Sequence, residues 1–416
     1  MEENNRMTLR EDADYIVKEA IRRVLPDEAV AAALKGKSFG SGRLYLEAAG
    51  KAAWQMAKTA VELLEDQLER GIVITKYDHV KGALPRISCY EAGHPVPDKN
   101  SFLATQAALD MVADLQEGDT VLFLLSGGGS ALFEKPLISG EELADITKQL
   151  WACGADIVEM NTIRKRFSAV KGGRFAKLCE PAKVYSIVLS DILGDPLDMI
   201  ASGPAYPDSS TCEQALAIAD KYQLQLSEQA MELLHQETPN KLHNVTTEIT
   251  GSVRNLCLAA KEACEALGYE AFILTDQLEC VAREAGIFLG DIAKSHQGAE
   301  KSLAFIAGGE TVVHLTGNGK GGRNQELALA AATVIDGLKD TAVFSVGSDG
   351  TDGPTDAAGG YSDHDTARLL SEKKINIFQV LQENDAYHAL KETGGLIMTG
   401  ATGTNVNDVA VVLVKR

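Results

Sequence analysis

The chain has 416 residues, which is enough for two domains of ordinary size and a large buried core. Apolar residues make up 45% of the chain and charged residues 24%, which excludes intrinsic disorder, collagen and small disulfide-stabilised scaffolds. The 40 basic and 59 acidic residues give a net charge of −19, which repels nucleic acid and anionic lipid. An anionic substrate would therefore require a local basic patch.

The sequence shows no sign of a membrane or secretory segment. Apolar runs such as VLFLL, residues 121–125, are far shorter than the ~20 residues that span a bilayer. The first twelve residues lack the apolar stretch of a secretory signal. The seven cysteines contain no CxxC pair, which is typical of reduced thiols. We expect a cytoplasmic protein with no membrane or nucleic-acid partner.

Apolar runs that end in glycine-rich loops alternate with helical patterns, which predicts an α/β fold. The runs are continuous rather than alternating, as expected for sheets covered by helices on both faces. The predicted strands are 43–49, 121–125, 184–189, 271–275, 303–307, 341–347 and 409–414, and the clearest helices are 52–69, 252–267 and 324–335. A polar stretch at 209–245 predicts a boundary between domains 1–240 and 241–416.

The first candidate site residue is Lys51, which is predicted to lie in the first turn of a helix just after a strand. The helix dipole disfavours a cation at this end, so another role should explain it. A cation at the carboxyl end of a strand suits a phosphate or a developing negative charge. A solvated surface lysine is the alternative.

A glycine-rich loop follows the predicted strand 121–125 and is expected to open a helix. Residues without side chains allow backbone amides to approach a phosphate, and a helix N-terminus adds positive charge. A tight strand-to-helix turn is the alternative, but it does not need three consecutive glycines. The loop matches neither the GxGxxG nor the Walker pattern. The predicted phosphate-binding residues are Ser126, Gly127, Gly128, Gly129 and Ser130.

The basic patch that the charge requires is predicted at residues 160–179, which contain six basic residues and no acidic one. Arg164 and Lys171 are seven residues apart, so a continuous helix would place them on one face. The alternative is a solvated helix face. The break at Gly172 and Gly173 favours an anion site.

Carboxylates follow several predicted strands. Asp191, Glu310 and Asp349 each lie within a few residues of a strand. The aspartates at 191, 195 and 198 and those at 349, 352 and 356 are spaced by three and four residues, which excludes an EF-hand loop. Carboxylates near phosphates suit Mg²⁺, and an aspartate near a hydroxyl can act as a base in phosphoryl transfer. The alternative is ordinary turn chemistry, since aspartate beside glycine is common in turns.

The segment TGNGKGGRNQELAL places Lys320 and Arg323 among glycines at a predicted helix start. Arginine can bind a carboxylate or phosphate through two parallel hydrogen bonds, which favours an anion site over a flexible loop. No GxSxG or HExxH motif occurs. His94, in EAGHPVPD, is interpreted as a turn or core histidine.

In chain order, the motifs LLSGGGSALFEKP, NTIRKRFSAVKGGR, LSDILGDPLDMIASGP, GGETVVHLTGNGKGGRNQELAL, SDGTDGPTDAAGG and TGATGTNVND resemble the glycerate 2-kinases that carry a MOFRL domain. The resemblance runs from Lys51 to Asp408. It implies ATP-dependent phosphorylation of D-glycerate at its 2-hydroxyl with Mg²⁺. It also implies two three-layer α/β domains with Rossmann-like, largely parallel sheets, an active-site cleft between them, and a MOFRL region at about 303–410.

The resemblance also implies site residues and their roles. Asp191 would orient or deprotonate the substrate hydroxyl, and Lys51 and Arg323 would hold the transferring phosphate and the glycerate carboxylate. Glu310 and Asp349 would position metal or nucleotide. The conserved polar positions of the family correspond to Lys51, Asp191, Glu310, Arg323, Asp349 and Asn407. Two positions depart from the family pattern, with Arg166 where histidine is frequent and Ala401 where proline is usual.

Two other functions remain as alternatives. One is an NAD(P)H-dependent hydroxypyruvate reductase, which the absence of a dinucleotide fingerprint disfavours. The other is a non-catalytic sensor of a phosphorylated acid, which the carboxylates at strand ends disfavour, since negative charge repels such a ligand. A homodimer is the expected oligomeric state on frequency alone.

Overall fold

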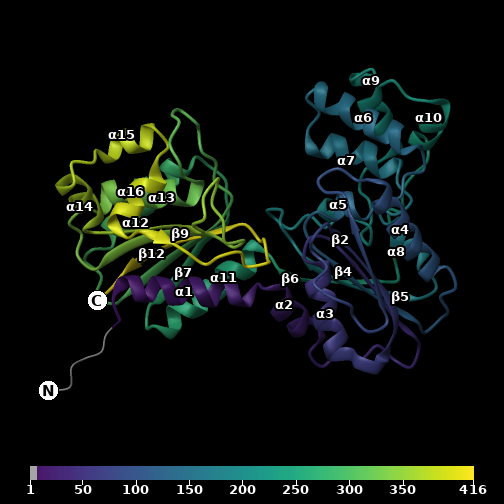
Figure 1. Ribbon diagram of the computed structural model, residues 1–416, viewed down its shortest axis with the longest axis horizontal. Helices are drawn as coiled ribbons and strands as arrows, with labels where there is room; N and C mark the ends of the chain where they lie inside the picture. The colour runs from purple at the N-terminus through teal and green to yellow at the C-terminus, as the bar shows by residue number, and fades with distance from the viewer. Residues whose placement is uncertain (1–6) are drawn as a thin grey trace. The chain divides into compact units, whose positions relative to one another are not determined.

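The computed structural model describes residues 7–416, and these residues group into two compact units. Unit A contains residues 29–190 and 195–250, and unit B contains residues 7–28, 191–194 and 251–416. Each unit is a β-sheet with helices on both faces (Figure 1). The predicted α/β fold is confirmed.

Unit A has a six-stranded sheet in the order β3-β2-β1-β4-β5-β6. Strands β3, β2, β1, β4 and β5 are parallel to one another. Side chains of β1 alternate between the two faces, with Leu46 in one apolar cluster and Tyr45 in the other. The strands are β1 Leu44–Ala49, β2 Leu68–Lys76, β3 Ile87–Ala92, β4 Thr120–Leu125, β5 Lys183–Leu189 and β6 Val245–Gly251.

Helices cover both faces of this sheet, and four more form a separate cluster. Helices α2 (Pro26–Leu34) and α3 (Ala53–Leu64) pack on one face, and α4 (Lys99–Val112) and α8 (Arg174–Leu178) on the other (Figure 1). The separate cluster has its own apolar core and contains α6 (Gly140–Ala152), α7 (Ile157–Arg166), α9 (Cys212–Lys221) and α10 (Glu228–Leu234). The remaining short helices are α5 (Gly129–Leu132), η1 (Glu65–Gln67) and η2 (Ile200–Ser202).

Unit B has a six-stranded mixed sheet in the order β11-β10-β9-β12-β8-β7. Strand β12 is antiparallel to both of its neighbours, β8 and β9, so the start of β12 lies beside their carboxyl ends. Strand β7 is parallel to β8, whereas β10 is antiparallel to β9 and β11. The strands are β7 Glu270–Leu278, β8 Leu303–Gly309, β9 Thr341–Gly347, β10 Gly359–Asp363, β11 Leu396–Ile397 and β12 Asp408–Val414.

The helices of unit B also cover both faces of the sheet. Helices α1 (Leu9–Arg23) and α11 (Val253–Ala266) share an apolar core with one face, and α12 (Ala282–Ser295) and α13 (Arg323–Ile335) with the other (Figure 1). Three short helices pack near α13, namely α14 (Thr366–Glu372), α15 (Ile377–Gln382) and α16 (Ala386–Thr393). No helix within residues 7–416 is both long enough and apolar enough to cross a membrane.

All seven predicted strands occur in the structure, as do the three predicted helices. Two boundaries differ from the predictions. The helix predicted at 52–69 ends at Leu64, because Glu65 adopts a positive φ of 44° and the chain then enters β2. The predicted domain 1–240 differs from the observed grouping, because the apolar face of α1 packs into the core of unit B.

One carboxyl group of β1 is buried without a partner. The Glu47 side chain is fully buried, neither of its oxygens accepts a hydrogen bond, and burial raises its pKa well above the usual 4.5. The folded protein therefore keeps a proton that the unfolded chain releases above pH 4.5. Because the folded state binds more protons, stability should fall as pH rises above that value, with a slope of up to about 1.4 kcal/mol per pH unit.

We predict that Glu47→Gln removes this part of the pH dependence and makes the protein more stable than wild type at pH 8. The measurement is chemical denaturation of both proteins from pH 5 to 8. Glu117→Gln, at an exposed position, should keep the wild-type slope. An unchanged slope in Glu47→Gln would show that Glu47 is ionised in the folded protein.

Candidate active site

The carboxyl edge of the unit A sheet brings two predicted site segments together. The strand order reverses between β1 and β4, and ligands of open α/β sheets bind at such a point. The loops after these strands are hydrogen-bonded, since the Lys51 amide donates to the Gly127 carbonyl at 2.8 Å. The Ala52 amide donates to the Ser126 hydroxyl at 3.1 Å. Lys51 and the glycine-rich loop therefore belong to one site.

Gly128 is required where it stands. Its φ is +87°, which favours glycine. A Cβ atom there would lie 2.9 Å from Cδ2 of His94 and 3.1 Å from Cγ of Lys51. The helix that follows, α5, has only four residues, so the predicted contribution of a helix dipole is not supported. Because Gly128 has no side chain, the backbone of the loop packs directly against His94 and Lys51.

His94, interpreted from the sequence as a turn or core histidine, lies beside the glycine-rich loop. Its imidazole lies against Gly128, and partial burial together with the charges of Lys51 and Lys76 lowers its pKa, so it is neutral at pH 7. Lys76 is the last residue of β2, and its side chain is half-buried. Because neither β2 nor β3 was among the predicted strands, no local pattern in the sequence placed these residues at the edge of a sheet.

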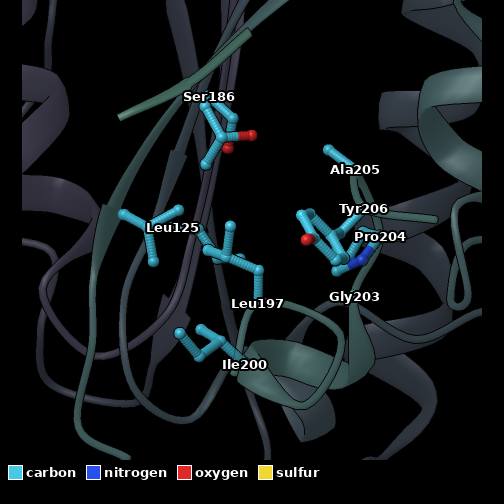
Figure 2. Close-up of a pocket in the computed structure, with 10 residues that line it drawn as sticks. Leu125, Ser186, Leu197, Ile200, Gly203, Pro204, Ala205 and Tyr206 are labelled. Atoms are coloured by element: carbon cyan, nitrogen blue, oxygen red, sulfur yellow. The ribbon is translucent and has the colours of Figure 1, made fainter. Parts of the chain in front are cut away.

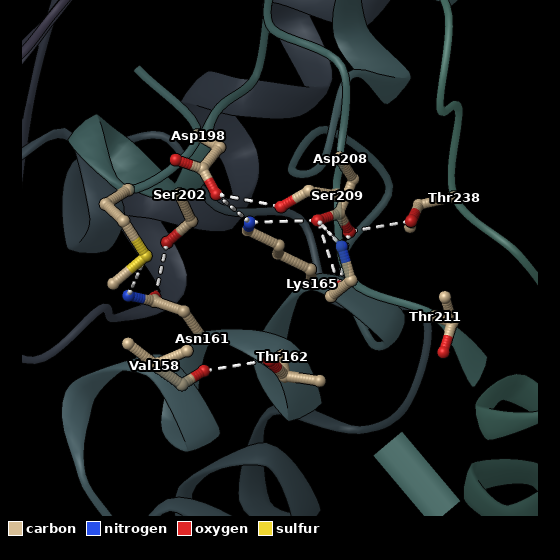
Figure 3. A network of polar contacts seen from close by, with 12 residues as sticks. Val158, Asn161, Thr162, Lys165, Asp198, Ser202, Asp208, Ser209, Thr211 and Thr238 are labelled. Carbon is tan, nitrogen blue, oxygen red and sulfur yellow. Dashed lines mark hydrogen bonds and ion pairs between the residues drawn. The ribbon is translucent and has the colours of Figure 1, made fainter. Parts of the chain in front are cut away.

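Most of the predicted basic patch at 160–179 is buried and paired, which corrects the prediction of an anion site there. Lys165 contacts Asp208 at 3.0 Å and Asp198 at 3.7 Å (Figure 3). Arg166 is fully buried, donates to the Thr238 hydroxyl at 3.0 Å and pairs with a glutamate. These cations hold the helical cluster to its neighbouring loops.

Lys171 is also fully buried and has no donor left for a substrate. Its ammonium donates to the carbonyls of Ser130 at 2.7 Å and Phe133 at 3.1 Å, and lies 3.0 Å from Glu134. Burial lowers the pKa of Lys171 to about 8, while Glu134 opposes this. Contrary to the sequence prediction, Lys171 supports the end of the glycine-rich loop rather than binding an anion.

Arg164 differs from its basic neighbours. It is half-buried, and its guanidinium forms no hydrogen bond or ion pair within residues 7–416. Its charge contributes to the lowered pKa of Lys171. Arg164 therefore remains a candidate for binding an anionic ligand.

The segment after β5 is strained where it meets the glycine-rich loop. Ala201, Ser202 and Gly203 all have positive φ, between 50° and 63°. The Ser202 hydroxyl lies 3.0 Å from that of Ser130 and donates to Asn161 at 3.0 Å. Consecutive left-handed residues are costly and cluster at functional sites. Asp191, at the start of this segment, is half-buried and groups with unit B.

A cavity behind this segment is not a substrate site. It lies among Leu125, Leu197 and Ile200, beside Pro204 and Tyr206 (Figure 2). Its volume is about 10 Å³, and most of its walls are apolar, so it has room for about one water molecule.

In unit B, Arg323 connects two acidic side chains at the carboxyl edge of the sheet. It donates to both carboxylate oxygens of Asp408, at 2.5 and 3.1 Å, and to Glu310 at 2.8 Å. Burial raises the pKa of Asp408, but the pairing with Arg323 opposes this. The register explains the arrangement, because Asp408 pairs with Gly309 of β8 and Gly347 of β9.

Asn407 and Asp349 complete this cluster. Asn407 has a φ of 65° and donates to Glu310 at 3.2 Å, while its own Oδ1 is buried without a hydrogen bond. Asp349 accepts from the Thr351 amide at 2.9 Å. The structure thus brings Glu310, Arg323 and Asn407 into direct contact. Asp349 lies beside Gly347, and Gly347 also lies next to Asp408.

The predicted anion site at the start of α13 is already occupied by the protein. Asp352 accepts from the amides of Asn324 at 3.1 Å and Gln325 at 2.9 Å, which are the donors a phosphate would use. Lys320 packs its ammonium 4.3 Å from the ring centroid of Tyr387. Sequence reasoning did not separate the capping role of Asp352 from the roles of the neighbouring aspartates.

Few side chains in the described residues are placed to bind a metal ion. Within residues 7–416 no group of three or more histidine, cysteine, aspartate or glutamate side chains could hold a metal ion. Mg²⁺ usually needs only one or two carboxylates, because phosphate oxygens and water supply the rest. Asp349 fits this requirement, whereas both oxygens of Glu310 already accept hydrogen bonds from Arg323 and Asn407.

Known proteins resemble this chain over nearly its whole length. Two family models match, one described as a domain of unknown function (DUF4147) at residues 12–235 and one as the MOFRL family at 303–408. A D-glycerate 2-kinase of Thermotoga maritima is 50% identical, over 98% of this chain and 99% of that protein. A crystal structure of a glycerate kinase of that organism has a TM-score of 0.94 at 50% identity, covering 98% of this chain and 99% of that one. A protein of Agrobacterium vitis that bears the name of a hydroxypyruvate reductase is 37% identical, over 90% of this chain and 100% of that protein.

The close packing at Gly128 generates a prediction about stability. Gly128→Ala should cost more than Gly118→Ala, because Gly118 has a similar φ of +95° but nothing within 4 Å of its Cβ position. Gly118→Ala isolates the cost of the backbone conformation, which is about 1 kcal/mol. Thermal and chemical denaturation of the two variants measure the difference. Equal losses would mean that His94 and Lys51 do not constrain the loop.

The buried Lys171 generates a second prediction. Lys171→Met should destabilise unit A by about 3–5 kcal/mol, because it leaves Glu134 buried without its cation. The double variant Lys171→Met, Glu134→Met should recover part of that loss. Lys177→Met, which removes an exposed pair with Glu180, is the control and should cost at most about 1 kcal/mol. Chemical denaturation gives all three values, and a loss in Lys171→Met no larger than the control would contradict the supporting role.

Proposed function

Because the chain belongs to the glycerate 2-kinase family, we propose that it transfers the γ-phosphoryl group of ATP to the 2-hydroxyl of D-glycerate, forming 2-phosphoglycerate and ADP. The observation that carries this proposal is the identity to a D-glycerate 2-kinase over nearly the full length of both chains. The crystal structure of a glycerate kinase with the same fold supports it.

The unit A edge supports binding of the transferring phosphoryl group. Lys51 and the glycine-rich loop lie at the strand-order reversal, and Arg164 is the one arginine of the basic segment 160–179 without an ion pair or side-chain hydrogen bond among the described residues. Phosphoryl transfer proceeds through a loose transition state, so catalysis depends on positioned cations and hydrogen-bond donors. We assign Lys51 the role of stabilising the negative charge that develops on the phosphoryl oxygens.

The unit B cluster supports binding of the remaining charged groups. Arg323 has a half-buried guanidinium that its two carboxylate partners hold in one orientation, and Asn407 is fixed beside it. We assign Arg323 and Asn407 the role of binding a carboxylate or phosphate group of a substrate. Asp349 would hold Mg²⁺, which, when bound, neutralises phosphate charge. Glu310 is placed to orient Arg323 rather than to bind the metal ion.

Asp191 is the proposed partner of the substrate hydroxyl. It lies two residues after Leu189, the buried end of β5, where a carboxylate can accept the proton of the 2-hydroxyl as the oxygen attacks the γ-phosphorus. The bond between that phosphorus and the bridging oxygen of ADP breaks in the same transfer. No electron transfer is involved, so the reaction needs no nicotinamide.

The test of the function is ³¹P NMR of the purified protein with ATP, Mg²⁺ and D-glycerate. We expect ADP and a 2-phosphoglycerate signal in equal amounts. A 3-phosphoglycerate signal would keep the kinase activity but overturn the assigned hydroxyl. Absence of ADP, with NADH oxidation in the presence of hydroxypyruvate, would replace the proposal by the reductase function.

We predict that Asp191→Asn lowers kcat by about 10²–10⁴-fold, because the amide cannot accept the hydroxyl proton. A coupled ADP-release assay measures this. Asp220→Asn, on the exposed surface of α9, is the matched control and should keep wild-type turnover. Near-normal turnover of Asp191→Asn would remove this residue from the mechanism.

A further inference from the structure

Three basic side chains lie at the carboxyl ends of three neighbouring strands of the unit A sheet. In the register, Ala49 of β1 pairs with Ile74 of β2, and Lys76 of β2 pairs with Ala92 of β3. Lys51 comes two residues after Ala49, Lys76 comes two residues after Ile74, and His94 comes two residues after Ala92. Because the strands are parallel, all three residues lie at the same edge of the sheet.

The three side chains are close enough to act on one another. The His94 ring and the Lys51 stem both lie against Gly128, and the charges of Lys51 and Lys76 act on the His94 imidazole. The glycine-rich loop adds donors to the same place, since the amides of Gly127 and Gly128 donate to no acceptor within residues 7–416. The result is a lysine, an imidazole and two N–H donors around one glycine, with Lys76 at the same edge of the sheet.

Within the described residues, neither lysine nor His94 forms an ion pair with a carboxylate. The nearby acids are held elsewhere, because Glu91 accepts from the amides of His79 and Val80 at 3.0 and 2.9 Å. Asp98 accepts from the Tyr77 hydroxyl at 2.6 Å. In a protein with a net charge of −19, a cluster of unpaired cations points to an anionic ligand.

We propose that His94 and Lys76 join Lys51 in a phosphoryl-binding subsite over Gly128, in which His94 donates a hydrogen bond from its ring and Lys76 supplies charge. The identity of the phosphoryl-bearing ligand rests on the proposed kinase function. Two ammonium groups, an imidazole and two amides match the several oxygens and the double charge of a phosphoryl group better than the single charge of a carboxylate.

The first experiment uses inorganic phosphate and does not depend on turnover. The imidazole proton signal of His94 is identified in the wild-type NMR spectrum by its absence from His94→Gln. Titration with phosphate should shift that signal. Lys76→Met should weaken phosphate binding by about ten-fold, and Lys76→Arg should restore most of the affinity because it keeps the charge. No shift, or wild-type affinity in Lys76→Met, would overturn the proposal.

Two matched controls separate binding from stability. Lys58→Met removes a lysine of the same unit that pairs with Glu62 on the surface of α3, and His235→Gln replaces an exposed histidine at the end of α10. Both should bind phosphate as wild type does. Thermal midpoints of all variants show whether each is folded at the assay temperature, and Lys76→Arg keeps the test informative if Lys76→Met unfolds.

The second experiment distinguishes a phosphoryl group from a carboxylate. In calorimetric titrations, His94→Gln and Lys76→Met should weaken binding of 2-phosphoglycerate about ten-fold more than binding of D-glycerate. Equal weakening for both ligands would place a carboxylate in the subsite and overturn the proposal. If the wild-type protein lacks kinase activity but phosphate still shifts His94, the subsite stands and the proposed function fails. If the kinase is active and both variants bind 2-phosphoglycerate normally, the function stands and the subsite fails.

Discussion

The reversal of strand order between β1 and β4 is the constraint on which the unit A site depends. Chains that leave adjacent parallel strands in opposite directions cannot cover the edge between them, so backbone and short side chains remain accessible there. Gly128 uses that space, because its missing side chain allows His94 and Lys51 to approach the loop. Buried Lys171 then supports the loop from behind through the carbonyls of Ser130 and Phe133.

Unit B reaches a comparable arrangement by different means. Its central strand β12 is antiparallel to β8 and β9, so the start of one strand meets the ends of two others. Asp408 therefore lies between Gly309 and Gly347 and can fix Arg323 through two hydrogen bonds. Arg323, the first residue of α13, is held in one orientation by Asp408 and Glu310 and places a cation at this edge.

Several strands were predictable from the sequence, but which charged side chains are buried and paired was not. Strands covered on both faces are continuous apolar runs, so β1, β4, β5 and β12 were predictable, whereas β2 was hidden because a helical pattern continued past Glu65. Arg164 and Lys171 look alike in the sequence. Only the distant Glu134 and two carbonyls make Lys171 structural, and only the fold brings His94 to Gly128. Such long-range partners have no local pattern.

The central place of β12 has a consequence for how the chain is synthesised. All strands of unit A precede residue 252, so that sheet can form while the rest of the chain is still on the ribosome. In unit B, the edges of β8 and β9 that pair with β12 stay open until residues 408–414 have been made. Open edges of apolar strands are templates for pairing with other chains. Newly made unit B is therefore the part of the protein that chaperones would have to protect.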